Sequence, residues 1–304
     1  MTTSRLTAPS MNALASERLR ESADPAIRRL AGDRSADALS SARVRKLLEF
    51  PKMHPYSKFA GTHWRLVALA DLGVPPRTKA VAVGIEQELA WLACGSRLQR
   101  APGAGGLVRV HASQEGNAIY AGARLGFATD PRVRKLVDAL LEWQWPDGGW
   151  NCGVNASGRR SSFHETVTPA LGLAAYHAAL GHRASLAAAR RAAELLLEHR
   201  LYRALRSGEV IHPSWTKPHY PPYWHYDIVQ GLRLLQAVGR LGDRRADDAL
   251  DLLERRRGRD GRFSGPSWNT AMQPDAVEWG RGADNEMLNL RIEGLLQAAR
   301  ASRR

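Results

Sequence analysis

The stretch NAIYAGARLGFATDPRVRKLVDALLEW, residues 117–143, joins two helical patterns at a glycine. Its first half, up to Gly126, is evenly apolar, which is typical of a helix buried on most sides. Its second half opens with Asp130 and Pro131, a favoured N-cap followed by a favoured first helical residue. The apolar residues after them recur at helical spacing, with Arg and Lys between them. The stretch therefore predicts a buried inner helix followed by an outer helix with one face in water.

This pair of patterns recurs along the chain. The evenly apolar segments lie at residues 63–76, 117–130, 167–182, 227–243 and 288–300. The glycines that break the first four, Gly73, Gly126, Gly181 and Gly239, are 53, 55 and 58 residues apart. The one-sided segments lie at residues 78–94, 130–143, 183–200 and 244–257. A fixed period of this size predicts an all-α protein built from stacked helical hairpins, arranged around a ring or as an open solenoid.

Residues 22–304 are expected to form a single domain, because a weaker helical stretch at residues 22–50 opens the array. Residues 1–21 carry little periodic signal, and we expect them to be partly disordered.

Charge and composition exclude several classes of protein. The 304 residues include 44 Lys and Arg against 30 Asp and Glu, a formal net charge of +14. No window holds about 18 uninterrupted apolar residues, and the N-terminus lacks the apolar core of a secretory signal, so we expect no membrane span. Two cysteines form no disulfide framework, which favours the cytoplasm. The basic residues are spread along the chain instead of clustered, so we expect no nucleic-acid partner.

The segment WQWPDGGW, residues 143–150, ends one outer-type helix. Its Gln144, its Asp-Gly-Gly turn and its Trp150 resemble the QW-type repeat of squalene/hopene cyclases and protein prenyltransferase β subunits. GRDGRFS (258–264) resembles a degraded copy. With SSFHET (161–166) and YPPYWHYD (220–227), the chain resembles bacterial prenyltransferase/squalene-oxidase-repeat proteins over residues 22–300. This resemblance to the terpenoid cyclase/protein prenyltransferase superfamily implies an α/α toroid of five to six helical hairpins.

The resemblance also implies a function. It predicts that a hydrophobic, isoprenoid-type small molecule binds in a central aromatic-lined cavity, where acid/base chemistry cyclises or isomerises it. Two signatures of the characterised families are absent. The chain has no DxDD motif, and it has Asn151-Cys152 where the prenyltransferases hold zinc with an Asp-x-Cys pair and a later His. These departures favour the alternative, a non-catalytic binding module or protein-interaction scaffold on the same fold.

The densest polar group in the sequence lies at the start of the third inner segment. Cyclisation or isomerisation needs a proton donor, and we predict His164 and Glu165 as the acid/base pair. The structural alternative is a capping box, in which Ser161 or Ser162 is the N-cap and Glu165 bonds back to it.

Polar residues also precede the other inner segments. If the helices close into a ring, these residues converge at one end, where aromatic side chains would complete a site for a hydrophobic ligand. Helix capping and packing between repeats are the alternatives. The predicted substrate-binding residues are His111, Glu115, Trp150, Cys152, Tyr223, Trp224, His225, Tyr226, Asp227, Asn285 and Glu286.

A metal site is weakly indicated. Asp147, Cys152 and His164 offer three side chains that zinc accepts, but their spacing matches no standard zinc motif. No dinucleotide-binding or P-loop motif occurs, so nucleotide cofactors have no support. We therefore predict no metal and no cofactor, and the sequence leaves the oligomeric state open.

Overall fold

The computed structural model describes residues 17–303, apart from residues 101–102, 154–157 and 272. Regular structure within these residues is helical and includes no strand, which confirms the all-α prediction. No helix among them is long and apolar enough to cross a membrane. Most of the segment that we expected to be disordered, residues 1–16, lies outside the described residues.

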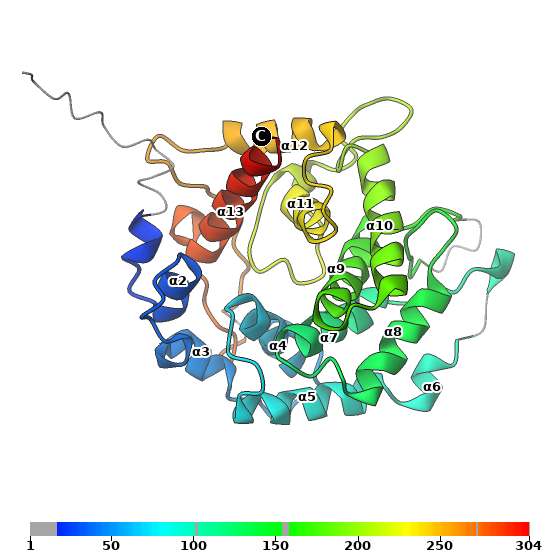
Figure 1. The fold of residues 1–304 in the computed structure, drawn as a ribbon, viewed down its shortest axis with the longest axis horizontal. Helices are drawn as coiled ribbons and strands as arrows, with labels where there is room; N and C mark the ends of the chain where they lie inside the picture. The colour runs from blue at the N-terminus through cyan, green and yellow to red at the C-terminus, as the bar shows by residue number, and fades with distance from the viewer. Residues whose placement is uncertain (1–16, 101–102, 154–157, 272, 304) are drawn as a thin grey trace, which may run out of the picture.

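Five helices lie inside and the others surround them (Figure 1). The inner helices are α4 (Thr62–Asp71), α7 (Ala112–Arg124), α9 (Phe163–Leu180), α11 (Ile228–Ala237) and α13 (Glu286–Ser302). The outer helices are α2 (Pro25–Leu30), α3 (Ala42–Leu47), α5 (Lys79–Leu92), α8 (Pro131–Trp143), α10 (Arg183–Glu198) and α12 (Asp247–Arg255). Short helical turns are α6 (Gly95–Leu98), η1 (Ala38–Ser40), η2 (Ala104–Gly106), η3 (Pro213–Thr216), η4 (Arg244–Ala246) and η5 (Gly282–Asp284).

The outer helix α8 shows why the sequence folds this way. Asp130 is its N-cap, and the carboxylate accepts a hydrogen bond from the main-chain N–H of Arg132 at 2.8 Å. Leu136 and Leu140 of this helix are fully buried, while Arg134 and Lys135 are exposed to water. Before this helix, Gly126 has a positive φ of 90°, which suits a residue without a Cβ atom. The two patterns of residues 117–143 therefore form the predicted inner and outer pair.

The inner helices α7 and α9 pack backbone against backbone. A Cβ atom on Gly116 would lie 2.5 Å from the Cα atom of Pro169, and one on Gly172 would lie 2.3 Å from the carbonyl oxygen of Gly116. Only glycine permits this approach, because real Cβ contacts are longer. The close packing brings the first turn of α9 next to the first turn of α7.

In the QW-like segment, Gln144 and Trp150 donate hydrogen bonds to main-chain carbonyl oxygens, as their side chains favour. The side-chain amide of Gln144 donates to the carbonyl oxygens of Gly148 at 2.7 Å and of Ala188 on α10 at 2.9 Å. Trp150 is fully buried in the hydrophobic core, and its indole N–H donates to the carbonyl oxygen of Leu140 at 3.1 Å. Trp150, which we predicted in the ligand site, therefore packs between helices.

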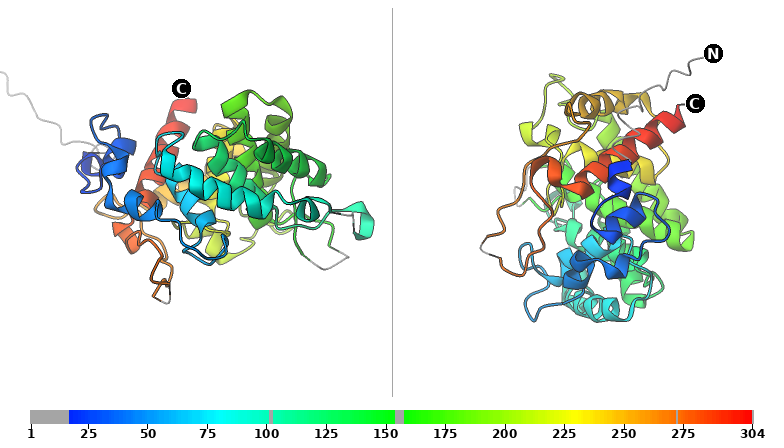
Figure 2. Two further views of the ribbon diagram at one scale, coloured as in Figure 1. Left: turned by 90° about the horizontal axis from the view of Figure 1, so that it is seen from below. Right: turned by 90° about the vertical axis from the view of Figure 1, so that its left-hand side faces the viewer.

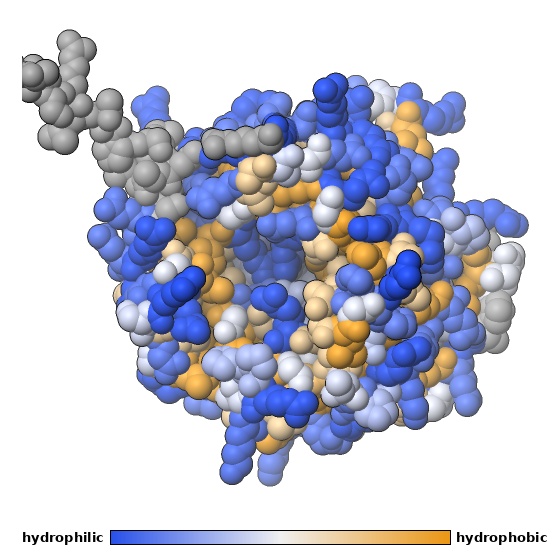
Figure 3. Space-filling view, viewed as in Figure 1, coloured by the Kyte–Doolittle hydropathy of each residue, from blue (hydrophilic) through white to orange (hydrophobic). Residues whose placement is uncertain are grey.

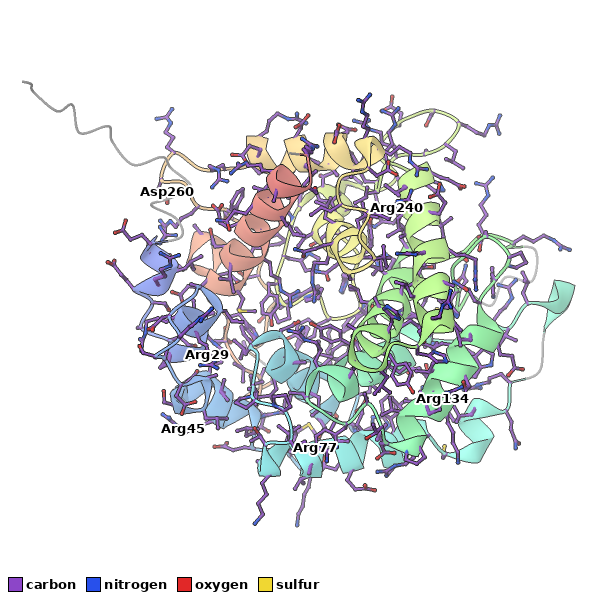
Figure 4. All side chains as sticks on the ribbon, viewed as in Figure 1. Arg29, Arg45, Arg77, Arg134, Arg240 and Asp260 are labelled. Atoms are coloured by element: carbon purple, nitrogen blue, oxygen red, sulfur yellow. The ribbon has the colours of Figure 1, made fainter. Side chains whose placement is uncertain are left out.

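The last inner helix lies beside the first outer helix. Helix α13 packs against α2, and the carbonyl oxygen of Asp275 accepts a hydrogen bond from Arg65 at 2.6 Å. Figure 2 (left) shows the C-terminal end of α13 and the loop of residues 264–280 on opposite sides of the molecule. In Figure 4, Arg29 and Arg45 lie at the lower left of the molecule, Arg77 at the bottom, Arg134 at the lower right and Arg240 toward the top. Basic side chains from distant parts of the chain are thus distributed around it.

Candidate active site at the start of the inner helices

Glu165 lies in the first turn of α9, but its carboxylate serves the neighbouring helix α7. Oε2 accepts a hydrogen bond from the main-chain N–H of Ser113 at 2.9 Å, and Oε1 lies 3.2 Å from Nδ1 of His111. Burial alone would raise the pKa of Glu165, but these hydrogen bonds outweigh burial and lower it. The hydrogen bond to Glu165 raises the pKa of His111. Glu165 is therefore an ionised buried carboxylate with an imidazole beside it.

The capping box expected at α9 is not formed. Ser162 is the N-cap residue, but its side chain accepts no capping hydrogen bond. Glu165 bonds to α7 instead, because the glycine-mediated packing places the unpaired N–H groups of α7 within its reach. The predicted partner of Glu165, His164, points elsewhere: its Nδ1 accepts a hydrogen bond from the main-chain N–H of Tyr226 at 2.9 Å.

A second buried carboxyl group, Glu115, lies one turn into α7. Its Oε1 is 3.2 Å from Nε of Arg97, and its Oε2 is buried without a hydrogen-bond partner among the described residues. Burial raises the pKa of Glu115, and the charge of Arg97 offsets this only in part. Two acidic residues on neighbouring helices thus have pKa values shifted in opposite directions.

A pocket of about 340 Å³ is lined by Glu115 and by His111, the imidazole that pairs with Glu165. Tyr56 and Trp91 form an aromatic wall, with ring centroids 5.7 Å apart. Burial raises the pKa of Tyr56 to about 12, so its hydroxyl stays protonated at neutral pH. The full lining is His54, Tyr56, Ser57, Trp91, Arg97, Arg100, Val110, His111, Gln114 and Glu115.

Cys152 completes the polar group around Glu165. Within the part of the chain that the structure describes, His111, Cys152 and Glu165 are the one set of three His, Cys, Asp or Glu side chains whose ligand atoms lie within 4.8 Å of one another. Imidazole, thiolate and carboxylate are all zinc ligands, so this set could hold a transition-metal ion. However, burial and then the charge of Glu165 raise the pKa of Cys152 to about 11, which keeps the thiol protonated. The hydrogen bonds of Glu165 are also complete without an ion.

The zinc ligands considered from the sequence are not assembled. Asp147 accepts hydrogen bonds from the main-chain N–H of Ser161 at 2.8 Å and from its hydroxyl at 2.6 Å. Asp147 therefore stabilises the turn of the QW-like segment. Of the three residues considered, only Cys152 belongs to the described cluster, and His111 and Glu165 take the other two places.

The other predicted histidines form a separate aromatic cluster. His164 and His225 have ring centroids 6.2 Å apart, and His225 lies 4.6 Å from Trp268. Burial first, then the charges of neighbouring histidines, lower the pKa of His225 to about 4. The ring of Trp224, beside His225 in the sequence, stacks on the ring of Phe59. The remaining predicted aromatic residues, Tyr223 and Tyr226, are buried in this region.

Two predicted site residues cap their own helices. Asp227 accepts a hydrogen bond from the main-chain N–H of Gln230 at 3.1 Å and pairs with Nδ1 of His219 at 2.8 Å. Burial would lower the pKa of His219, but the carboxylate of Asp227 outweighs burial and raises it. Asn285 accepts from the main-chain N–H of Leu288 at 3.0 Å. Glu286 is half-buried in the first turn of α13.

The centre of the molecule holds a small cavity, which we call the central chamber, of about 30 Å³. Its lining mixes aromatic and polar side chains: Trp64, Val67, Ala68, Asp71, Asn117, Tyr120, Thr168, Leu171, Tyr220, Pro221, Pro222, Tyr223, His225, Gln230 and Arg233. Of the predicted site residues, Tyr223 and His225 reach this chamber.

Comparison with protein-family models, curated proteins and solved structures found no match. The structural features that support a function are therefore those of this chain alone.

Sequence reasoning placed His111, Glu115, Cys152 and Glu165 in one site, and the structure brings these four together. It missed Arg97, which pairs with Glu115 from the short helix α6. Gln114 lies next to Glu115 in the sequence and was not predicted as a site residue, although it lines the pocket. No sequence motif marks Arg97, because its role depends on how α6 packs against α7.

Proposed function

We propose that this protein is an enzyme that isomerises or cyclises a small hydrophobic molecule by proton transfer in the pocket beside His111. The observation that carries the proposal is the arrangement of Glu115, whose Oε2 is buried without a partner among the described residues, next to the pair of His111 and Glu165 on the neighbouring helix starts. Burial raises the pKa of Glu115, and hydrogen bonds lower that of Glu165. Titratable neighbours whose environments separate their pKa values are characteristic of acid/base catalysis. Glu115 is then the proton donor, and His111, paired with the carboxylate of Glu165, is the proton acceptor.

The reaction that fits this pair moves a proton without changing the composition of the ligand. The carboxyl group of Glu115 gives its proton to one atom of the ligand, and the imidazole of His111, which lines the pocket and is paired with Glu165, removes a proton from another atom. Exchange with solvent then returns both groups to their starting state. Glu165 positions His111 through its hydrogen bond, and the ring of Tyr56 can stabilise a developing positive charge.

The class of ligand is inferred from the residues that line the pocket and from the sequence resemblance. Tyr56, Trp91 and Val110 offer an apolar surface, and the volume of about 340 Å³ suits a molecule of modest size. The narrower class, an isoprenoid, is supported by the QW-like segment and its sequence resemblance.

We further infer that the helices form the α/α toroid implied by that resemblance. Inner and outer helices alternate along the chain (Figure 1), and α13 packs against α2, so the last hairpin lies beside the first.

The test uses farnesol as an isoprenoid probe in D₂O, with deuterium incorporation at carbon followed by mass spectrometry. The wild-type protein should catalyse incorporation, and Glu115→Gln and Glu165→Gln should each slow it by about 100-fold or more. Both variants keep a side chain of the same size. In Glu165→Gln the new amide oxygen can still accept from the main-chain N–H of Ser113, so thermal unfolding should stay close to that of the wild type.

Two outcomes would contradict catalysis. Binding of farnesol without deuterium incorporation would favour the non-catalytic binding module. Equal incorporation by Glu115→Gln and by the exposed control Glu86→Gln would show that the carboxyl group of Glu115 does not supply the proton.

A further inference from the structure

The central chamber has a different chemistry from the pocket beside His111, and the two share no lining residue. The floor of the chamber contains the buried carboxylate of Asp71. It accepts hydrogen bonds from the hydroxyl of Tyr120 at 2.8 Å and from Arg233 at 3.3 Å, and it forms an ion pair with Arg291. Two guanidinium groups therefore face one carboxylate, which leaves an excess of positive charge in the centre of the molecule.

Three residues that line the chamber have a buried side-chain nitrogen without a partner among the described residues: His225, at Nδ1, and two whose nitrogens are donors. The two donors are the indole N–H of Trp64 and the side-chain amide nitrogen of Gln230, whose residues are 5 % and 3 % exposed. A buried donor without a partner destabilises the fold, and a bound acceptor would remove that cost. Donors that line the same cavity as Arg233 are complementary to an anion.

A wider cavity of about 330 Å³, which we call the funnel, shares Tyr120, Leu171 and Arg233 with the chamber. Its other lining residues are Arg124, Ala174, Ala175, Ala178, Gln236 and Ala237. The funnel thus combines an apolar wall of small side chains with two guanidinium groups, and its lining, as far as the structure describes the chain, includes no acidic residue. Figure 3 shows a recess near the centre of the face on which α13 ends, with hydrophilic residues inside and hydrophobic residues at its sides.

We propose that the chamber and the funnel together bind an amphiphilic carboxylate, that is, a carboxylate group on an apolar chain. The carboxylate accepts hydrogen bonds from Trp64, Gln230 and Arg233 in the chamber. The apolar chain passes the three shared residues and lies along the alanine wall of the funnel. A chamber of about 30 Å³ has room for about two water molecules or one carboxylate, which is why the chain must lie outside it.

The experiment is isothermal titration calorimetry on the full chain with sodium decanoate, and with 1-decanol as the uncharged probe of equal chain length. Decanoate should bind with one molecule per chain, and decanol should bind at least about tenfold more weakly, because it lacks the charge that Arg233 pairs with. Equal affinity for the two probes, or no binding of decanoate, would overturn the proposal.

Variants separate the two parts of the site. Trp64→Phe removes an N–H that bonds to nothing in the described part of the protein, so it should weaken decanoate binding about tenfold without breaking an internal hydrogen bond. Ala178→Trp fills the mouth of the funnel from an exposed position and should abolish binding. The control Arg134→Gln, which removes an exposed guanidinium paired with Asp138 on α8, should leave the affinity unchanged. Unchanged affinity in both site variants would refute the proposed location.

The proposal does not depend on catalysis in the pocket beside His111. Glu115→Gln should therefore bind decanoate as the wild type does, and a parallel loss of affinity in this variant would contradict the separation of the two sites.

Discussion

The starts of α7 and α9 differ from the starts of α11 and α13, although all four carry polar residues at matching places in the sequence. Asp227 and Asn285 accept hydrogen bonds from N–H groups of their own helices. At α7 and α9 neither N-cap side chain makes such a bond, and Glu165 bridges from one helix to the other. Where a side chain caps its own helix, as Asp227 and Asn285 do, its polar atoms are used in that helix. Where a side chain bonds to the neighbouring helix, as Glu165 does, it brings polar groups of two helices together.

Removing a self-cap should have the largest effect on stability. In Asp227→Ala, α11 loses its cap and the buried His219 loses its carboxylate partner, so we expect the free energy of unfolding to fall by about 3 kcal/mol. Urea unfolding measures this. Asp130→Ala, which removes a more exposed cap from the outer helix α8, should cost only about 1 kcal/mol. Equal losses in the two variants would contradict a special role for Asp227.

The glycine contact between α7 and α9 can be broken directly. Gly116→Ala places a Cβ atom against the backbone of Pro169, so we expect a loss of about 2 kcal/mol together with a disturbed pocket. Gly294→Ala is the matched control, because nothing lies within 4 Å of its Cβ position in α13. The control should gain about 0.5–1 kcal/mol from helix propensity. A stabilised Gly116→Ala would show that the two helices can separate without cost.

The shared cap itself is tested at one residue with two substitutions. Glu165→Ala leaves the N–H of Ser113 without an acceptor and should cost about 1–2 kcal/mol in chemical unfolding. Glu165→Gln keeps an oxygen acceptor and should cost less. A loss as large in the Gln variant would mean that the charge, rather than the hydrogen bond to Ser113, stabilises the start of α7.

The two regions should also differ in their response to pH. The pKa of His225 is lowered to about 4, whereas its value in the unfolded chain is near 6.5. As the pH falls from 6.5 to 4, the unfolded chain gains the proton first and the fold loses stability. His225 is only partly buried, so we expect this loss to be about 1 kcal/mol. His225→Asn should be less sensitive to acid by that amount in unfolding experiments at pH 7 and pH 4.5.

His111 should respond with the opposite sign and a smaller effect. Its pKa is raised by Glu165, so its stabilising contribution is complete below pH 6.5 and is lost as the pH rises through the folded value. His111→Asn should therefore flatten the decline in stability above pH 6.5. An unchanged pH profile would show that His111 stays neutral beside Glu165.

The inner and outer helices could be predicted from the sequence because their apolar patterns differ, as at Leu136 and Leu140 of α8. Two features of the site could not be predicted from the sequence. Glu165 meets His111 rather than His164 because Gly116 and Gly172 let the backbones approach, a distance that no local pattern encodes. Trp150 was expected in the site, but its indole N–H is used in the core. A tryptophan near a polar loop has the same sequence pattern in either role.

The packing of α7 against α9 has a consequence for motion. Hydrogen bonds in the most tightly packed elements open least often, so amide hydrogen exchange should be slowest in these two helices. Glu115 and Glu165 both lie on these helices, whereas His54, Tyr56, Ser57 and Arg100 in the lining of the pocket belong to loops. A ligand would thus enter by displacing the loops that line the pocket, while the carboxyl groups on α7 and α9 stay in place.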